Sequence, residues 1–488
     1  MKEEGLKKRA VSNFLWKFLE QVSSQIVNLI VSIVLARILL PEDYGVVTVI
    51  LIFITICDVF IIQGFSSALI QKKDADELDF SSMFHASFII SFLLYLILFF
   101  TAPLIQDLFG PQYESLSSIL RVMGLQIPLS SLKSTQQAFV SRELLFKKFF
   151  FATMSGKIVS AVVGIYMALK GFGAWALAGQ MLSAIIVDTA ILYLIVSWKP
   201  KMVFSMKRVI PMLNYSYKLV LAGVVDTVYN KLRSFVIGVR YSPDNLAFYD
   251  KGDQFPSVLG NTTNSSLMAV LFPVMSKFQD DAKSLLMICR RSVKICTYVI
   301  FPMMAGLFVV APEIITFLLT EKWLPCVPYM QVFCAVYAFY PIYTVNLQAI
   351  KAIGKSGAFL LVEVLKKIAG IICLIIAIPY GVIWIAISLL VATFLNYIIN
   401  GVASRRYLYY GYWAQIKDIL PNLAISIVMA IAIYLIPSLS NHLIIDLSIK
   451  IIAGVLVYVA LSFITHNESY SYLKEMLTKK AYEVKRED

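Results

Sequence analysis

Polar side chains recur along one face of an otherwise apolar segment near the N-terminus. They are Asn13, Lys17, Glu20, Ser24, Asn28 and Ser32. Because residues three or four positions apart lie on the same side of a helix, this spacing predicts a continuous polar stripe. A charge at the centre of a bilayer costs about 2.5–3.5 kcal/mol, even on insertion scales. We therefore expect Lys17 and Glu20 to face a polar cavity, or else to form an ion pair that joins two helices.

A second polar stripe follows within residues 211–239. Its members are Asp226, Asn230, Lys231 and Arg233. A turn beginning with Pro41 follows the first stripe, and a turn beginning with Pro243 follows the second. Aligning these two prolines places Asn28 on Asn230. The matching turns and stripes predict an internal repeat whose two copies line one shared cavity.

Charged side chains in other apolar segments add to this predicted cavity. They are Asp58, Arg121, Lys133, Lys157, Asp188, Glu363, Lys366 and Lys367, of which Lys157 is the best candidate for a buried role. Lys and Arg are the usual phosphate-binding side chains, so the cavity favours an anionic, phosphate-bearing substrate. The predicted substrate-binding residues are Lys17, Glu20, Asn28, Lys157, Asp226, Asn230, Lys231 and Arg233. The acids Glu20, Asp58 and Asp226 could pair with these cations or carry coupling protons or Na⁺.

The elements that position these residues are predicted to be membrane helices. The 488-residue chain is 59% hydrophobic and 15% charged, whereas soluble domains carry about 25% charged residues. A soluble fold of this size would expose an aggregation-prone apolar surface. At about 20 apolar residues per crossing, we predict an all-α polytopic membrane protein with about 14 helices. They cover residues 13–40, 45–70, 82–108, 116–140, 150–170, 173–197, 211–239, 247–275, 292–318, 328–350, 357–378, 381–403, 418–437 and 444–465.

Loop charges predict the orientation and the division into lobes. Lys and Arg concentrate in alternate connections and at both ends of the chain, so the positive-inside rule places both termini in the cytoplasm. Topology and attraction to anionic lipid headgroups then explain the net charge of +13, and nucleic-acid binding loses its support. Because an even number of helices separates the repeats, we predict two parallel six-helix lobes, at residues 1–210 and 211–410. Residues 411–488 add two C-terminal helices and a cytoplasmic tail.

The sequence contains no recognisable catalytic, metal or cofactor constellation. Its three histidines are far apart, and its six cysteines form no CxxC pair. It has no GxxxxGK[ST] loop, so we do not expect it to hydrolyse ATP. The loops are too short for the catalytic acids of a membrane glycosyltransferase or polymerase. We therefore predict a carrier rather than an enzyme, without metal or cofactor, and coupling to Na⁺ or H⁺ is left open.

Three segments resemble those of a known family. Residues 35–45 (LARILLPEDYG), 64–71 (GFSSALIQ) and 271–276 (LFPVMS) are similar to segments of bacterial polysaccharide exporters. These exporters belong to the multidrug/oligosaccharidyl-lipid/polysaccharide exporter superfamily. The chain departs from the family pattern at Ala247, where many relatives have glycine.

This resemblance implies a flippase for an undecaprenyl-pyrophosphate-linked oligosaccharide, such as a capsule, O-antigen or exopolysaccharide unit. Its lobes would alternate between inward-open and outward-open states in the bacterial inner membrane, and the last two helices would form a groove for the polyprenyl tail. The implied partners are the lipid-linked glycan, membrane lipids, and polysaccharide polymerase or export machinery. A peptidoglycan lipid-precursor flippase and a cation-coupled multidrug antiporter of the same superfamily are the alternatives.

Overall fold

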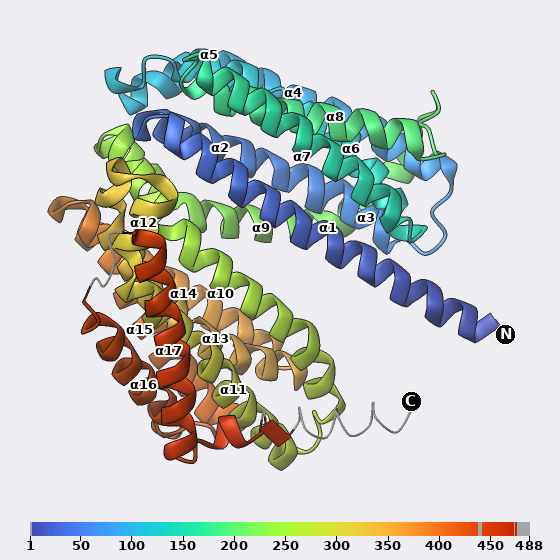
Figure 1. The fold of residues 1–488 in the computed structure, drawn as a ribbon. Coiled ribbons are helices and arrows are strands. Elements are labelled where there is room, and N and C mark those ends of the chain that lie inside the picture. Colours follow the sequence, from blue (N-terminus) through green and yellow to red (C-terminus); the bar gives the residue numbers. More distant parts are fainter. Residues whose placement is uncertain (1, 438–441, 473, 476–488) are drawn as a thin grey trace. The chain divides into compact units, whose positions relative to one another are not determined.

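All regular elements of the structure are helices (Figure 1), in a computed structural model that describes residues 2–437, 442–472 and 474–475. The long helices of the first half are α1 (Lys2–Ile38), α2 (Pro41–Ile61), α4 (Glu77–Phe109), α6 (Gln126–Arg142), α7 (Phe146–Leu169), α8 (Ala174–Ile195) and α9 (Met206–Arg240). Those of the second half are α10 (Pro243–Lys277), α11 (Ala282–Val309), α13 (Val327–Ala352), α14 (Ser356–Ala377), α15 (Val382–Leu408), α16 (Tyr412–Tyr434) and α17 (Leu443–Ile464). Every predicted apolar segment therefore overlaps a helix.

Membrane-spanning character is clearest for part of this set. Within the described residues, nine helical stretches are long and apolar enough to cross a membrane. The chain is thus a multi-pass helical membrane protein. Five of the long helices are not among the nine: α6, α9, α10, α13 and α14. In α14 the reason is charge, because Glu363, Lys366 and Lys367 lie close together in an otherwise apolar helix. The number of fourteen crossings stays a prediction.

Three predicted segments are interrupted in the structure. Residues 116–140 divide into α5 (Leu116–Met123) and α6, which carries Pro128 in its first turn. Residues 292–318 divide into α11 and α12 (Ala311–Leu319), which carries Pro312 in its first turn. Residues 45–70 contain a π-helical turn, η1 (Ile62–Ser66), between α2 and α3 (Ser67–Gln71). Proline lacks the N–H that would continue the preceding helix, which explains the first two breaks but not the π-helical turn.

The chain packs into two compact units, Met1–Ala247 and Phe248–Asp488. In the first unit, α7 packs against α1 and α8, and α9 packs against α2 and α4. In the second unit, α11 packs against α13 and α16, and α15 packs against α13 and α14. The packing boundary follows α9, whereas the repeat places α9 at the start of the second lobe, so the lobe boundaries stay predictions. The end of the predicted cytoplasmic tail, residues 476–488, lies outside the described residues.

The two turns that indicated a repeat begin equivalent helices. Pro41 is the first residue of α2, and Pro243 is the first residue of α10. A Cβ atom on Gly45 would overlap the backbone carbonyl of Pro243, so only glycine permits this close approach. Both turns belong to the first unit, where the start of α2 contacts the start of α10.

Candidate functional site

Lys17 and Glu20 form an ion pair within α1. The Lys17 Nζ lies 2.7 Å from the Glu20 Oε2, and Glu20 is buried. The same Nζ lies 4.8 Å from the ring centroid of Phe149 on α7. The pair therefore forms within one helix, between residues three positions apart. Its link to α7 is a cation–π contact.

A second ion pair joins α6 to α8. The Lys133 Nζ lies 2.5 Å from the Asp188 Oδ2, and Asp188 is buried. Lys133 Nζ also lies 5.8 Å from the Phe149 ring centroid. The Phe149 ring therefore makes a cation–π contact with the lysine of each of the two pairs. The sequence identified Lys133 and Asp188 as intramembrane charges but did not assign them to the site.

Two further charges complete this group. Lys157 on α7 interacts electrostatically with Lys133, Asp188 and Glu20. Asp58 on α2 interacts with Lys133. We call the resulting set the first-unit cluster. Its members are Lys17, Glu20, Asp58, Lys133, Lys157 and Asp188.

Close backbone packing holds the centre of the first-unit cluster together. A Cβ atom on Gly156 of α7 would lie 2.7 Å from the carbonyl oxygen of Ala184 and 3.0 Å from the Cβ of Asp188. A side chain at this position would push α7 away from α8. Lys157, the next residue on α7, interacts electrostatically with Asp188. Glycine thus sets the geometry of the charges beside it.

The first-unit cluster is balanced between lysines and carboxylates. The sequence predicts a cavity with several basic residues and interleaved acids, and in the first-unit cluster three carboxylates accompany three lysines. Buried charges persist when they are paired, and removing one charge leaves its partner uncompensated. Protonation of one carboxylate would therefore release a lysine to bind an anion, and arrival of an anion would favour that protonation. Such an arrangement can couple anion binding to the uptake of a proton or another cation.

The other predicted site residues lie elsewhere in the first unit. They are Asn28, Asp226, Asn230, Lys231 and Arg233, of which the first three are exposed on α1 and α9. Lys231 is half-buried. Arg233 is buried, with its guanidinium carbon 5.9 Å from the ring centroid of Tyr229 on the same helix. Asn28 and Asn230, which the repeat aligns, are both exposed ten residues before the ends of their helices, α1 at Ile38 and α9 at Arg240. That these residues line one shared cavity stays a prediction.

The sequence analysis missed a buried lysine in the second unit. Lys251 on α10 is 6% exposed and donates a hydrogen bond to the Gln254 Oε1 at 3.0 Å. Its Nζ lies 5.6 Å from the ring centroid of Trp323. The sequence contained one signal for this site, namely a lysine in a predicted membrane segment that also carries Asp253 and Gln254. It was overlooked because Lys251 lies near the predicted end of its membrane segment.

A second charge pair lies on α14 of the same unit. The Lys366 Nζ is 2.6 Å from the Glu363 Oε1 and 4.9 Å from the ring centroid of Tyr343 on α13. Lys366 is buried. Within the part of the chain that the structure describes, no group of three or more His, Cys, Asp or Glu side chains could hold a metal ion.

Comparisons with known proteins identify the family and the fold. A family model described as "Polysaccharide biosynthesis protein" matches residues 34–328. The chain is 27% identical over 317 residues to the "Succinoglycan biosynthesis transport protein ExoT" of Rhizobium meliloti (strain 1021). That match covers 65% of this chain and 64% of the relative, which is less than two thirds of the relative's length.

Solved structures show the same fold. One described as "Lipid II flippase MurJ, inward closed conformation" has a TM-score of 0.77 and 20% identity, covering 93% of this chain and 99% of that one. An inward-facing multidrug resistance MATE family transporter of the MOP superfamily has a TM-score of 0.62 and 15% identity, covering 81% of this chain and 94% of that one. At these identities the likenesses establish the fold alone.

Proposed function

This chain belongs to the polysaccharide biosynthesis protein family, and from that premise we propose that it is a flippase for a polyprenyl-pyrophosphate-linked oligosaccharide. It would carry the glycan from the cytoplasmic to the outer leaflet of a bacterial inner membrane by alternating access. The transport role of the succinoglycan relative supports an exported glycan as substrate. The likeness to a lipid II flippase supports a lipid-linked one.

The observation that carries this proposal is the first-unit cluster. Three lysines on helices of the first unit supply cations of the kind that bind phosphate. They are Lys17 on α1, Lys133 on α6 and Lys157 on α7. Their pairing with carboxylates provides a means of release, since an ammonium freed from its partner can bind a pyrophosphate and then return. Glu20 and Asp188 form ion pairs with Lys17 and Lys133, and Asp58 interacts electrostatically with Lys133. We propose that H⁺ or Na⁺ exchange at these acids accompanies transport.

The polyprenyl tail requires an apolar surface, and the second unit offers one. A pocket of about 410 Å³ lies between α11, α13 and α16. Its lining includes Phe301, Phe308, Phe339, Ile427 and Tyr434. α17 does not contribute to this lining, so α16 with α11 and α13 is a better candidate for the tail groove than the last two helices alone.

A peptidoglycan lipid-precursor flippase is the second candidate. The observation in its favour is the TM-score of 0.77 to the lipid II flippase, over 93% of this chain. Both substrates share a polyprenyl pyrophosphate, so the first-unit cluster suits either one. The family membership favours the polysaccharide substrate.

A genetic experiment separates the two candidates. The chain's own gene is deleted, and lipid-linked oligosaccharide is measured in the outer leaflet and as exported polymer. We expect export to stop in the deletion strain and to return with the wild-type gene. In parallel, the gene is expressed in a strain depleted of its lipid II flippase. Rescue of growth there, with normal polymer export in the deletion strain, would replace the proposed substrate by the peptidoglycan precursor.

A further inference from the structure

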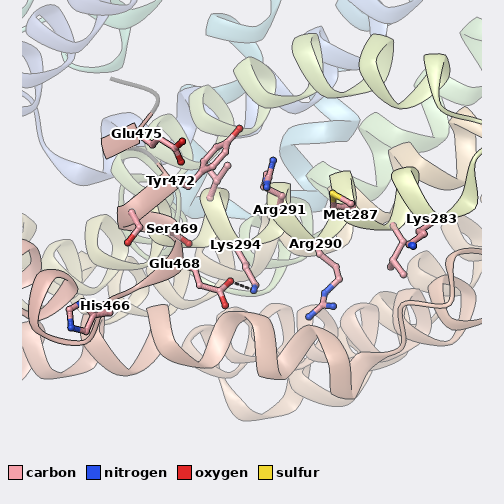
Figure 2. A pocket seen from close by; sticks show the side chains of 13 residues that line it. Lys283, Met287, Arg290, Arg291, Lys294, His466, Glu468, Ser469, Tyr472 and Glu475 are labelled. Atoms are coloured by element: carbon pink, nitrogen blue, oxygen red, sulfur yellow. Dashed lines mark hydrogen bonds and ion pairs between the residues drawn. The ribbon is translucent and has the colours of Figure 1, made fainter. Parts of the chain in front are cut away.

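A basic pocket lies where α11 meets the segment that follows α17 (Figure 2). Its volume is about 780 Å³, and one wall is the first half of α11. The other wall is formed by six residues after α17: His466, Glu468, Ser469, Ser471, Tyr472 and Glu475. The basic side chains of the lining are Lys283, Arg290, Arg291 and Lys294, all from α11. The acidic ones are Glu468 and Glu475 from the opposite wall. Cations therefore outnumber anions around this pocket.

One of these cations, Arg290, is held in place by a bidentate ion pair with Asp418. The Arg290 guanidinium donates from Nε and Nη2 to the two carboxylate oxygens of Asp418, at 2.8 and 2.7 Å. The Tyr410 hydroxyl donates to the same carboxylate at 2.8 Å, and Asp418 is buried on α16. The Arg290 side chain is nevertheless 48% exposed. Asp418 therefore fixes one edge of the guanidinium and leaves the Nη1 edge for a ligand.

The neighbouring cations have partners on the opposite wall of the pocket. The Arg291 guanidinium carbon lies 4.6 Å from the Tyr472 ring centroid, across the pocket from α11. Lys294 Nζ lies 2.5 Å from the Glu468 Oε2 and 3.4 Å from the Asp418 Oδ1. Figure 2 shows Lys294 directed at Glu468, which is 78% exposed on the opposite wall. An incoming anion can displace so exposed a carboxylate at little cost, because a surface ion pair contributes only about 0–1 kcal/mol.

The start of α11 is itself well defined. Asp281 caps the helix by accepting hydrogen bonds from the backbone N–H groups of Lys283 and Ser284, at 3.0 and 3.1 Å. Two hydrogen bonds from Ser284 lower the pKa of the Asp281 carboxyl below its usual range, and the one from the Ser284 hydroxyl has a larger effect than the one from its backbone N–H. The Lys283 backbone is thus anchored while its side chain extends toward the pocket.

The basic pocket adjoins a lipid-facing helix surface. α17 ends at Ile464, and Phe463 in its last turn is 59% exposed. A smaller pocket lined by Phe463 shares His466, Ser471 and Glu475 with the basic pocket. Farther along α17, Ile452, Val455, Leu456 and Val459 are exposed at helical spacing. The basic pocket thus follows the end of a helix that is long and apolar enough to cross a membrane, the position at which lipid headgroups are expected.

We propose that this pocket binds the phosphate headgroup of an anionic phospholipid, with its acyl chains along the exposed face of α17. Guanidinium, ammonium and hydroxyl donors around one cavity suit a phosphate monoanion or diester. The bound phosphate replaces Glu468 as the partner of Lys294. Lipid binding is therefore linked to the position of Glu468 in the segment that follows α17. Anionic lipid therefore stabilises the second unit through a site separate from the first-unit cluster.

The test compares the full chain in two membranes. Purified protein is reconstituted in phosphatidylcholine vesicles with and without phosphatidylglycerol, and thermal unfolding is measured. The test variant is Lys283→Gln with Arg291→Gln, which leaves the Arg290–Asp418 contact intact. The control is Arg406→Gln, since Arg406 is exposed and its guanidinium also lies over a tyrosine, Tyr407, at 5.8 Å.

We expect phosphatidylglycerol to raise the unfolding temperature of the wild type and of Arg406→Gln, and to raise that of the double variant by less than half as much. An equal rise in all three proteins would overturn the proposal. If inorganic phosphate in the buffer reproduces the rise in phosphatidylcholine alone, the site is one for a soluble anion and the lipid assignment is wrong. A photoreactive phosphatidylglycerol provides a second measurement on the wild type, independent of the variant's folding. Crosslinks are expected within residues 283–295 or 466–475, and crosslinks confined to other segments would contradict the proposal.

Discussion

Lys133 of α6 and Asp188 of α8 form an ion pair with 2.5 Å between Nζ and Oδ2. They come from separate helices, and Lys157 of a third helix interacts with both. Gly156 brings α7 close enough to Asp188 for this arrangement. The pair therefore ties three helices of the first unit to one set of charges.

Replacing Asp188 by asparagine removes the partner of Lys133 and leaves a lysine in a largely buried position. Breaking a buried pair from one side costs about 3–5 kcal/mol. We expect Asp188→Asn to lower the unfolding temperature in detergent, measured by loss of monodisperse protein on heating. Asp107→Asn is the control, because Asp107 is an exposed carboxylate in the same unit.

The double variant Lys133→Gln with Asp188→Asn tests the same pair in a different way. With both charges gone, the uncompensated lysine is absent, so the double variant is expected to be more stable than Asp188→Asn. The loss of stability in the double variant is compared with the losses in Lys133→Gln and Asp188→Asn alone. If it equals their sum, the two side chains act independently.

Neutralising the cations of the predicted cavity is expected to reduce glycan export. Lys17→Gln and Lys157→Gln test the first-unit cluster, and Lys231→Gln and Arg233→Gln test α9. We expect each cluster variant to lower export at least about tenfold, equivalent to about 1.4 kcal/mol of lost interaction, with unchanged amounts of membrane protein. Lys170→Gln, at the exposed end of α7, should export normally.

The outcome also divides the two groups of predicted residues. Loss of export in Lys17→Gln and Lys157→Gln alone would locate the anion site in the first-unit cluster. Loss in Lys231→Gln and Arg233→Gln as well would extend it to α9, as the repeat predicts. Normal export in all four variants would exclude the site assignment.

A methyl group at Gly45 is expected to disrupt the contact between the two repeat turns. The added Cβ would overlap the carbonyl of Pro243, and relief requires movement of backbone. Overpacking of this kind costs about 1–3 kcal/mol, so Gly45→Ala should unfold at a lower temperature than the wild type. Gly357→Ala is the matched control, since no atom lies within 4 Å of a Cβ there. It should be neutral or slightly stabilising, and equal losses in both variants would rule out the steric explanation.

The ion pair between Arg290 on α11 and Asp418 on α16 is expected to stabilise the second unit. The Asp418 carboxylate accepts from Arg290 and Tyr410 and lies 3.4 Å from Lys294. Hydrogen bonds to charged groups contribute about 1.5–3 kcal/mol each, and the exposure of Arg290 places the loss at the lower end. Asp418→Asn should therefore lower the unfolding temperature, while Lys417→Gln, at the exposed neighbouring residue, should not. A neutral Asp418→Asn would show that the contact forms without stabilising the unit.

The linear pattern of the chain was sufficient for its class and for much of its helical layout. Every predicted apolar segment overlaps a helix, because burial in lipid requires long apolar runs that hydropathy detects directly. The Pro41 and Pro243 turns begin α2 and α10, since proline favours the first turn of a helix. Helical spacing also placed Lys17 and Glu20 on one face, where they form an ion pair. The breaks after α5 and α11 escaped detection, because an interrupted helix keeps the same mean hydropathy.

The sequence by itself determined which charges lie inside the membrane segments, and only the tertiary structure decided their partners. Helical periodicity assigns a side chain to a face of its own helix, but it does not say which other helix covers that face. Lys133 meets Asp188 across α6 and α8, and Lys251 is buried beside Trp323, through contacts between residues distant in sequence. The first-unit cluster contains three lysines and three carboxylates, and it is the fold that brings Asp188 to Lys133 and places Lys157 near both.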